Sequence, residues 1–376
     1  MSRLFAAILL LPSLVFAGVT FETDSRELNR TRPGASYAEM LAQVTPAVVS
    51  IRIAKTIPNE VIRRLRGRLT AEDLKQLKVD AQTGEVLLFQ GLGSGTIVNP
   101  NGYIITNRHV VLISDDRTGG VKIANAAYVT LSDKREFKAQ VLGVDEKTDI
   151  AVLKINEKNL PFARFADSDK CRVGDTVFAI GNPLGVGMTV TSGIVSGLSR
   201  SDTGVGLAYQ DFIQTDASIN AGNSGGPLID FEGRIIGMNT MIRTASGQGG
   251  NIGIGFSIPS NLISDVALDL ANTGKVTRGF LGLFGEDLET DMAKKLKLNN
   301  GAVRITEVAE ASPAFRGGLR KDDIITAVDG KSFESWNELR IIIARRKPGE
   351  VMQLSMIRNG ANSLVNITVS ERAPGN

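Results

Sequence analysis

Gly222-Asn223-Ser224-Gly225-Gly226-Pro227 places a serine among glycines past the middle of the 376-residue chain. Glycine adopts backbone conformations closed to other residues, so this turn can expose a serine and aim amide N–H groups at a developing oxyanion. A serine hydroxyl needs a base to take its proton, and His109 is the only histidine in the sequence. The sequence therefore predicts that Ser224 is a nucleophile and that His109 is its general base.

The base in turn needs a carboxylate to orient it and to stabilise its cation. Asp149 stands at the start of the apolar run 150–153, where an acid can be buried and still reach an imidazole. Asp145 and Asp133 are the alternatives. The chain order histidine, aspartate, serine is that of chymotrypsin-like proteases and differs from subtilisin and the α/β-hydrolases. It favours a mainly β fold with a chymotrypsin-like double β-barrel.

Composition limits the class of protein. With 42% hydrophobic and 22% charged residues, the chain resembles an ordinary globular protein, and its length suggests two domains. Lys and Arg number 43 against 40 Asp and Glu, a balance too even to neutralise many phosphates, so we expect no nucleic-acid partner. The single cysteine, Cys171, cannot form an intrachain disulfide and fits no metal-ligand spacing, so we interpret it as a packing residue.

The N-terminus has the pattern of an export signal. Arg3 precedes a largely apolar run over 4–16, which is shorter than the ~20 residues of a membrane-spanning helix. Val15 and Ala17 are small residues at the positions that signal peptidase favours. We predict a cleaved signal peptide over 1–17, followed by an N-terminal segment over 18–36 and export to the periplasm. An uncleaved membrane anchor is the alternative.

Short β-branched runs separated by glycine or polar turns predict a strand-rich protease domain over 37–274. A helix should begin near Ser36, and a second one, capped by Ser260 and followed by Gly274, should close the domain. The basic stretch 55–85 is predicted to be a surface loop with a helix around 71–77. The expected strands are 47–51, 95–98, 103–106, 127–131, 150–155, 176–180 and 234–238.

A second strand-rich unit follows over 275–376. Within it, Ser335-Trp336-Asn337-Glu338 forms a capping box that predicts the start of a helix.

Six motifs follow one another along the chain, at 91–97, 102–111, 148–154, 179–183, 189–196 and 216–227. Together they closely resemble the HtrA/Deg family of exported serine proteases. This resemblance implies a trypsin-like double β-barrel followed by one PDZ domain, as in the DegS-like branch, with no cofactor or metal and with assembly as a homotrimer. Higher assembly is left open.

The resemblance also implies roles for single residues. Ser224 is the nucleophile, His109 the general base and then acid, and Asp149 the orienting carboxylate. The backbone amides of Gly222 and Ser224 form the oxyanion hole. Arg200 matches the arginine of a regulatory sensor loop, which would span 201–210.

The specificity pocket is expected to be apolar. Ile219, Met241 and Ile242 suggest an S1 site for small aliphatic side chains, although Arg243 stands where the family usually has a hydrophobic residue. Ser218 lies six residues before the nucleophile, so no counter-charge supports cleavage after Lys or Arg.

The second domain should bind C-terminal peptides. Phe280, Leu281, Gly282 and Leu283 resemble the loop that captures a terminal carboxylate in the PDZ domains of this family, with the peptide adding as a strand beside it. The helix from Ser335 would form the far wall of the groove.

These inferences predict an ATP-independent periplasmic serine endopeptidase that acts through an acyl-enzyme on misfolded or regulatory envelope proteins. Binding of C-terminal peptides to its PDZ domain would gate the activity. The alternative is a chaperone or PDZ scaffold with a mostly silent protease site.

Overall fold

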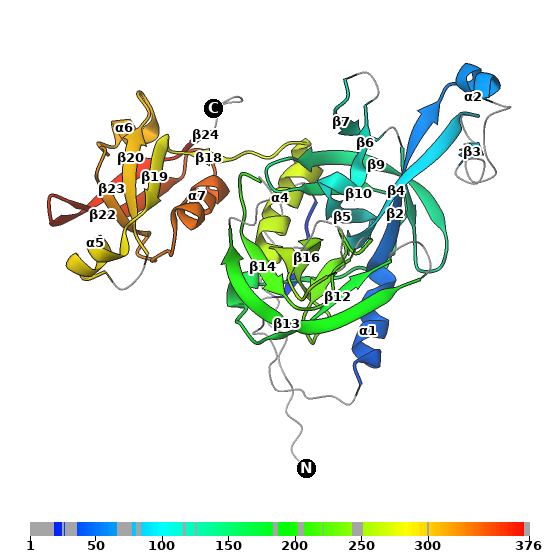
Figure 1. Cartoon of the computed structure of the whole chain (residues 1–376), viewed down its shortest axis with the longest axis horizontal. Helices are drawn as coiled ribbons and strands as arrows, with labels where there is room; N and C mark the ends of the chain where they lie inside the picture. The colour runs from blue at the N-terminus through cyan, green and yellow to red at the C-terminus, as the bar shows by residue number, and fades with distance from the viewer. Residues whose placement is uncertain are drawn as a thin grey trace, which may run out of the picture.

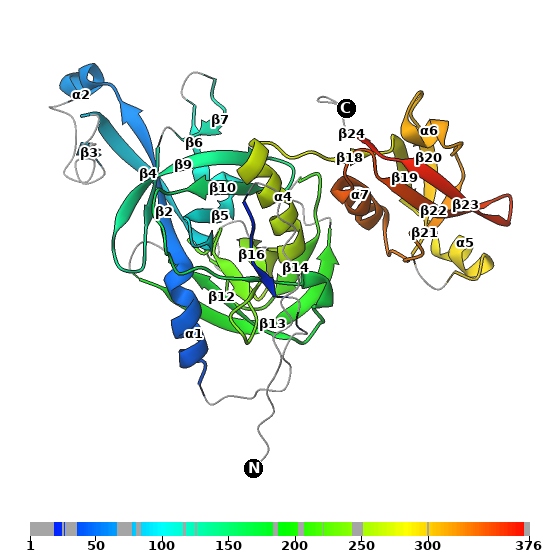
Figure 2. The same cartoon turned by 180° about the vertical axis from the view of Figure 1, so that it is seen from behind.

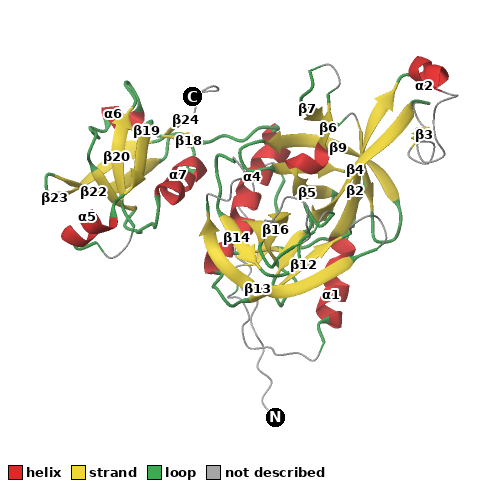
Figure 3. Ribbon diagram, viewed as in Figure 1, coloured by secondary structure: helices red, strands yellow, loops and turns green. Residues whose placement is uncertain are grey.

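The computed structural model shows two bodies, a larger one built from the first two thirds of the chain and a smaller one at the C-terminus (Figures 1 and 2). Strands predominate in both, which confirms the predicted mainly β class (Figure 3). The structure describes residues 19–24, 26, 36–65, 77–79, 84–115, 118–124, 126–182, 187–201, 207–220, 222–242, 251–298 and 301–371.

The first barrel is a seven-stranded sheet in the order β2-β8-β9-β10-β5-β4-β3, closed by pairing of β2 with β4. Its interior is aliphatic, with Ile97, Ile104 and Val152 fully buried. Its strands are β2 (Val48–Ile57), β3 (Leu77–Val79), β4 (Val86–Asn99), β5 (Tyr103–Asn107), β8 (Ala126–Thr130), β9 (Glu136–Asp145) and β10 (Ile150–Lys154). A separate hairpin of β6 (Leu112–Ser114) and β7 (Val121–Ile123) follows the short helix η2 (Arg108–Val111).

The second barrel is an eight-stranded sheet in the order β1-β11-β16-β15-β12-β13-β14-β17, closed by pairing of β16 with β17. Phe165, Phe178 and Phe212 fill its core. Its strands are β1 (Thr23–Asp24), β11 (Phe165–Ala166), β12 (Thr176–Gly181), β13 (Thr189–Arg200), β14 (Phe212–Thr215), β15 (Pro227–Ile229), β16 (Ile235–Ile242) and β17 (Gly255–Pro259), with the short helix η3 (Ser168–Lys170) between β11 and β12. Two consecutive barrels confirm the predicted double β-barrel.

The prediction of a loop over 55–85 was wrong for the residues of this stretch that the structure describes, most of which lie in strands or a helix. β2 and β4 continue past the barrel as a paired hairpin, in which Lys55 lies opposite Leu88 and Ile57 opposite Val86. The hairpin carries α2 (Asn59–Leu65) and β3, and it projects from the barrel (Figure 1). Cross-strand pairing of the apolar positions outweighs the charged composition of the segment. The helix predicted around 71–77 lies mostly outside the described residues, and Leu77 begins β3.

Helices cover the ends of the barrels. After α1 (Ala38–Val44) and η1 (Thr45–Ala47), the long helix α4 (Ser260–Thr273) packs its apolar face on β9 and β10 and ends at Gly274, whose φ of 74° is left-handed as predicted. The N-cap is Pro259 rather than Ser260, because the Ser260 hydroxyl donates instead to the Ala166 carbonyl at 2.6 Å.

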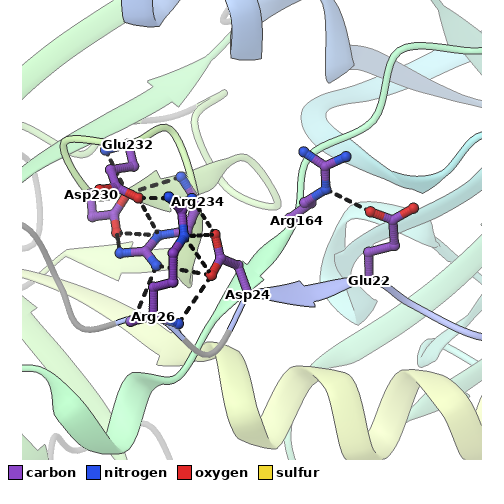
Figure 4. Close-up of polar contacts among 7 residues, drawn as sticks. All are labelled: Glu22, Asp24, Arg26, Arg164, Asp230, Glu232 and Arg234. Atoms are coloured by element: carbon purple, nitrogen blue, oxygen red, sulfur yellow. Dashed lines mark hydrogen bonds and ion pairs between the residues drawn. The ribbon is translucent and has the colours of Figure 1, made fainter. Parts of the chain in front are cut away.

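The N-terminal segment joins the second barrel. β1 pairs in parallel with β11, and Phe21 packs edge-on against Phe165 with ring centroids 5.9 Å apart. Close by, Glu22 accepts a hydrogen bond from Arg164 at 2.6 Å (Figure 4). Residues 19–24 and 26 therefore form part of the folded protease body.

A charge cluster fastens this segment (Figure 4). The buried Arg234 guanidinium pairs with Asp230 at 2.7 Å and donates to the Arg26 carbonyl at 3.1 Å. Arg26 in turn pairs with Asp24 and with Glu232. The hydrogen bond from Arg26 is the main cause that lowers the pKa of Asp24 to about 2.

The C-terminal body is a five-stranded sheet in the order β19-β20-β21-β22-β23 with the helix α7 beside it. The Ser335 hydroxyl accepts from the Glu338 amide at 3.2 Å and caps α7, as the sequence predicts. The elements are β18 (Gly279–Phe280), β19 (Leu283–Asp287), α5 (Thr290–Lys295), β20 (Val303–Val308), α6 (Pro313–Arg316), β21 (Ile324–Val328), α7 (Trp336–Arg345), β22 (Val351–Arg358), β23 (Ala361–Thr368) and β24 (Ser370–Glu371).

The predicted signal peptide lies outside the described residues. In the part of the chain that the structure describes, no helix is long and apolar enough to cross a membrane.

Candidate active site

His109 and Asp149 form a tight pair in the first barrel. His109 lies in η2 directly after β5, and Asp149 lies in the turn before β10, the strand that pairs with β5. The Asp149 carboxylate contacts His109 Nδ1 at 2.7 Å and accepts the His109 backbone N–H at 3.0 Å. With Nδ1 held by the carboxylate, Nε2 is the ring nitrogen left to act as a base.

The two alternative acids, Asp145 and Asp133, pair with arginines. Asp145 pairs with Arg278, and Asp133 pairs with Arg135 on the surface at 2.8 Å. Of the three carboxylates, Asp149 is the one that contacts the imidazole.

The second barrel carries Ser224 on the turn before β15, facing the first barrel. The described hydrogen bond of its hydroxyl is to the Thr240 carbonyl, at 3.3 Å. Within the described residues, no hydrogen bond joins Ser224 to His109. The acid–base pair is thus assembled, while the serine hydroxyl is directed to a neighbouring strand.

The turn around Ser224 leaves two amides available. Gly222 has a φ of 98°, which favours glycine, and the amides of Asn223, Gly225 and Gly226 donate to backbone carbonyls. The amides of Gly222 and Ser224 donate to no other residue that the structure describes. They are the two amides expected to form an oxyanion hole.

Sequence reasoning gave no role to Ser94, a fully buried residue of β4 that links the two barrels. Its amide donates to the Ser224 carbonyl at 2.9 Å and its hydroxyl to the Gly222 carbonyl at 2.6 Å. The same hydroxyl accepts from the Asn182 amide at 2.8 Å. Ser94 thereby fixes both ends of the nucleophile turn. The available signal was a polar residue between two glycines in an apolar strand.

Thr240 was missed as well. Its hydroxyl donates to the Asp149 carboxylate at 3.1 Å and accepts from the Asn107 side-chain amide at 3.0 Å, and its carbonyl accepts from Ser224. One residue of β16 thus contacts both the acid and the nucleophile.

The residues expected to line S1 meet around Gly255. Ile219 is buried, and a Cβ on Gly255 would lie 2.9 Å from its Cδ1. Gly255 is the strand partner of Ile242, and Met241 is paired with Phe256. The side chains of Met241 and Ile242 lie outside the described part of the structure, as does Arg243.

Arg200 contacts its own sheet. It ends β13, and its Nε donates to Gln214 of β14 at 2.9 Å. The structure does not bring Arg200 to the Ser224 turn through any described contact, and residues 202–206 of the expected sensor loop lie outside the described residues.

The linker to the second domain contacts the neighbourhood of the catalytic acid. Arg278 forms a two-pronged ion pair with Asp145, and both side chains are about nine-tenths buried. Asp145 also accepts hydrogen bonds from the amide and hydroxyl of Thr148, the residue before Asp149. Linker position and the Asp149 turn are therefore physically connected.

Helix α7 contacts the C-terminal end of the expected sensor loop itself, within the described residues 207–210. Asn337 donates to the Gln210 carbonyl, and Arg340 donates to the Ala208 carbonyl at 2.6 Å. Burial raises the pKa of Asp211, the next residue in this segment, whose carboxylate also bonds to Ser199.

The expected carboxylate loop precedes the edge strand β19. Leu281 and Leu283 are buried and Gly282 has a φ of 75°, while Phe280 pairs with Ser370 in the small sheet of β18 and β24. A Cβ on Gly282 would lie 2.3 Å from Ser312, so glycine is required there. The amides of Leu281 and Gly282 donate to no described residue and can hold an anion.

Comparison with known proteins agrees with this geometry. The family of trypsin-like peptidase domains matches residues 93–238, and the PDZ domain family matches residues 285–369. The periplasmic pH-dependent serine endoprotease DegQ of Escherichia coli K12 is 42% identical over 343 residues, covering 90% of this chain and 70% of that protein.

A probable periplasmic serine endoprotease, DegP-like, of Chlamydia muridarum is 44% identical over 74% of this chain and 54% of its own length. The chain thus spans between about half and seven tenths of these curated relatives. Among solved structures, the HtrA-type protease AlgW with a tripeptide superposes with a TM-score of 0.68 at 37% identity, covering 90% of this chain and 98% of that one.

The fold, the motifs and these relatives agree, and the chain belongs to the HtrA/Deg family of serine endoproteases, in which a trypsin-like double β-barrel precedes a PDZ domain.

Proposed function

We propose that this protein is an ATP-independent periplasmic serine endopeptidase whose nucleophile is Ser224, and that C-terminal peptides at its PDZ domain switch it on. The observation that carries the proposal is the 2.7 Å contact between His109 Nδ1 and Asp149, facing a glycine turn with two available amides.

The reaction follows from these groups. The Ser224 hydroxyl attacks the scissile carbonyl while His109 Nε2 takes its proton, and Asp149 stabilises the resulting imidazolium. The amides of Gly222 and Ser224 hold the oxyanion. His109 then protonates the leaving amine. Water, activated by the same base, attacks the acyl-enzyme and frees Ser224.

We propose misfolded or regulatory envelope proteins as substrates, cut after small aliphatic residues. Ile219, buried against Gly255, supports an apolar pocket floor. The relatives DegQ and DegP-like are named as periplasmic endoproteases, which supports a periplasmic location and export by the predicted signal peptide over 1–17.

The proposed domain plan is an N-terminal segment over 18–36, part of which pairs with the second barrel through β1, a protease domain over 37–274 and a PDZ domain over 275–376. Assembly as a homotrimer is proposed on the family resemblance alone.

The switch is proposed to act on the Ser224 turn. The loop of Phe280, Leu281, Gly282 and Leu283 would bind the peptide carboxylate, and this binding would shift the PDZ domain. Helix α7 of that domain contacts Ala208 and Gln210, so the shift would reach this protease segment. In the sequence, Ala208 and Gln210 lie between Arg200 and Gln214. The shift is proposed to release Arg200 from Gln214 so that Arg200 engages the Ser224 turn.

The alternative of a chaperone or PDZ scaffold with a silent protease site is less well supported, because the exposed His109 imidazole is already paired with the buried Asp149 carboxylate. The test is degradation of unfolded casein by purified protein and by Ser224→Ala. We expect the variant to lose turnover while keeping the same melting temperature. Equal degradation by both proteins would contradict the assignment of Ser224.

A further inference from the structure

The edge strand of the PDZ sheet presents an exposed phenylalanine beside the expected peptide groove. Phe284 of β19 is 53% exposed, whereas its neighbour Leu283 is only 8% exposed. Successive side chains of a strand point to opposite faces, which places Leu283 inward and Phe284 outward. The pairing with β20 shifts register between Phe284 and Gly285, with the additional residue on β20, so β19 keeps its alternation and Gly285 faces inward. A Cβ on Gly285 would lie 3.3 Å from the Trp336 ring of α7, which identifies the inward face as the one toward α7.

β19 has room for an added strand. Among the described residues it pairs with one strand, β20, and it stands first in the sheet order. A peptide whose terminal carboxylate meets the amides of Leu281 and Gly282 ends where β19 begins. The peptide must therefore run antiparallel to β19.

This direction, together with the position of the carboxylate at the amides of Leu281 and Gly282, sets the register. With the last residue beside Leu283, the penultimate residue lies opposite Phe284 and the third from the end opposite Gly285. Residues directly opposite each other in an antiparallel pair project their side chains to the same face. The last and third-last side chains then point toward α7, and the penultimate side chain lies against the Phe284 ring.

We propose that Phe284 selects the penultimate residue of the bound peptide and favours an aromatic or large aliphatic side chain there. Such a side chain would cover a ring that is otherwise half exposed to water. This inference rests on the proposed function, because it assumes capture of a C-terminal carboxylate by the loop before β19.

The test uses fluorescent nine-residue peptides that share one sequence and end in leucine, with Phe, Leu, Gly or Asp at the penultimate position. Dissociation constants are measured by anisotropy with the full chain carrying Ser224→Ala, so that no peptide is cut. We expect the Phe peptide to bind about 3- to 10-fold more tightly than the Gly peptide, the range that aromatic cross-strand pairs support.

Matched variants test whether the preference for the penultimate residue depends on the Phe284 ring. Phe284→Ala should reduce the Phe-to-Gly ratio to near one, and Phe284→Leu should keep most of it. Leu364→Ala is the control, because Leu364 is 63% exposed on β23, at the opposite edge of the same sheet. It should leave the ratio unchanged.

The outcomes distinguish the inference from its premise. If peptides bind but Phe284→Ala keeps the full ratio, the role of Phe284 is wrong and peptide capture stands. If an amidated C-terminus binds as well as a free one, or if no peptide binds, carboxylate capture is wrong and the inference fails with it.

Discussion

The two halves of the active site are built to different degrees. On the first barrel, Asp149 receives hydrogen bonds from the His109 ring, the His109 amide and the Thr240 hydroxyl, all between 2.7 and 3.1 Å. On the second barrel, the Ser224 hydroxyl has a longer bond of 3.3 Å to a carbonyl that takes no part in proton transfer.

This difference indicates where control can act. His109 in η2 and Asp149 in the turn before β10 are joined to each other and to Thr240 by three hydrogen bonds, so the orientation of the imidazole is already set. The backbone of the nucleophile turn is bonded to Ser94 and Asn239, while the Ser224 hydroxyl donates to the Thr240 carbonyl. Under the proposed switch, activation would consist of placing Ser224 and the amides of Gly222 and Ser224, with His109 already oriented by Asp149.

The largest expected effect comes from the His109–Asp149 pair on the first barrel. Asp149→Asn should lower kcat by about 10⁴-fold, because the amide favours the wrong imidazole tautomer and cannot stabilise the imidazolium. The measurement is steady-state cleavage of a peptide with a small aliphatic residue at the cleavage site.

Asp133→Asn is the matched control, since Asp133 was an alternative acid and pairs with Arg135 on the surface. It should retain full activity. A loss in Asp133→Asn, or none in Asp149→Asn, would show that the pair has been assigned wrongly.

A smaller effect is expected from the hydrogen bond between Ser94 of the first barrel and Gly222 of the second. Ser94→Ala removes the donor to the Gly222 carbonyl and the acceptor of the Asn182 amide. Loss of such buried bonds costs about 1–3 kcal/mol, so kcat/KM should fall by about 10- to 100-fold if this free energy holds the turn in place.

Ser50→Ala is the control for general destabilisation, because Ser50 is a buried serine on β2 of the same barrel. Both variants should be assayed well below their melting temperatures. Activity of Ser94→Ala within twofold of the parent would contradict a role of Ser94 in holding the turn.

The sequence indicated the candidate reacting residues more completely than the residues that hold them in place. Ser224 and His109 are marked by a glycine turn and by the lack of any other histidine, and chain order pointed to Asp149. Ser94 acts on Gly222 from 128 residues away, and Arg278 reaches Asp145 across 133 residues. Such contacts depend on how the barrels and the linker close, which no local pattern encodes.

The same limit explains the extended hairpin. Its charged residues between 55 and 85 suggested a loop, while the pairing of β2 with β4 is a property of two separated segments. In contrast, the C-terminal end of α4 at Gly274 and the cap of α7 at Ser335 follow local rules and were predicted correctly.

The central claim is that peptide binding controls the reactivity of Ser224. Its most direct test is the rate at which a fluorophosphonate labels Ser224, with and without a peptide bearing a free apolar C-terminus. Mass spectrometry of the labelled chain locates the adduct. We predict faster labelling of Ser224 when the peptide is present and no change with its amidated form. An equal rate in both conditions would contradict peptide control of the serine turn.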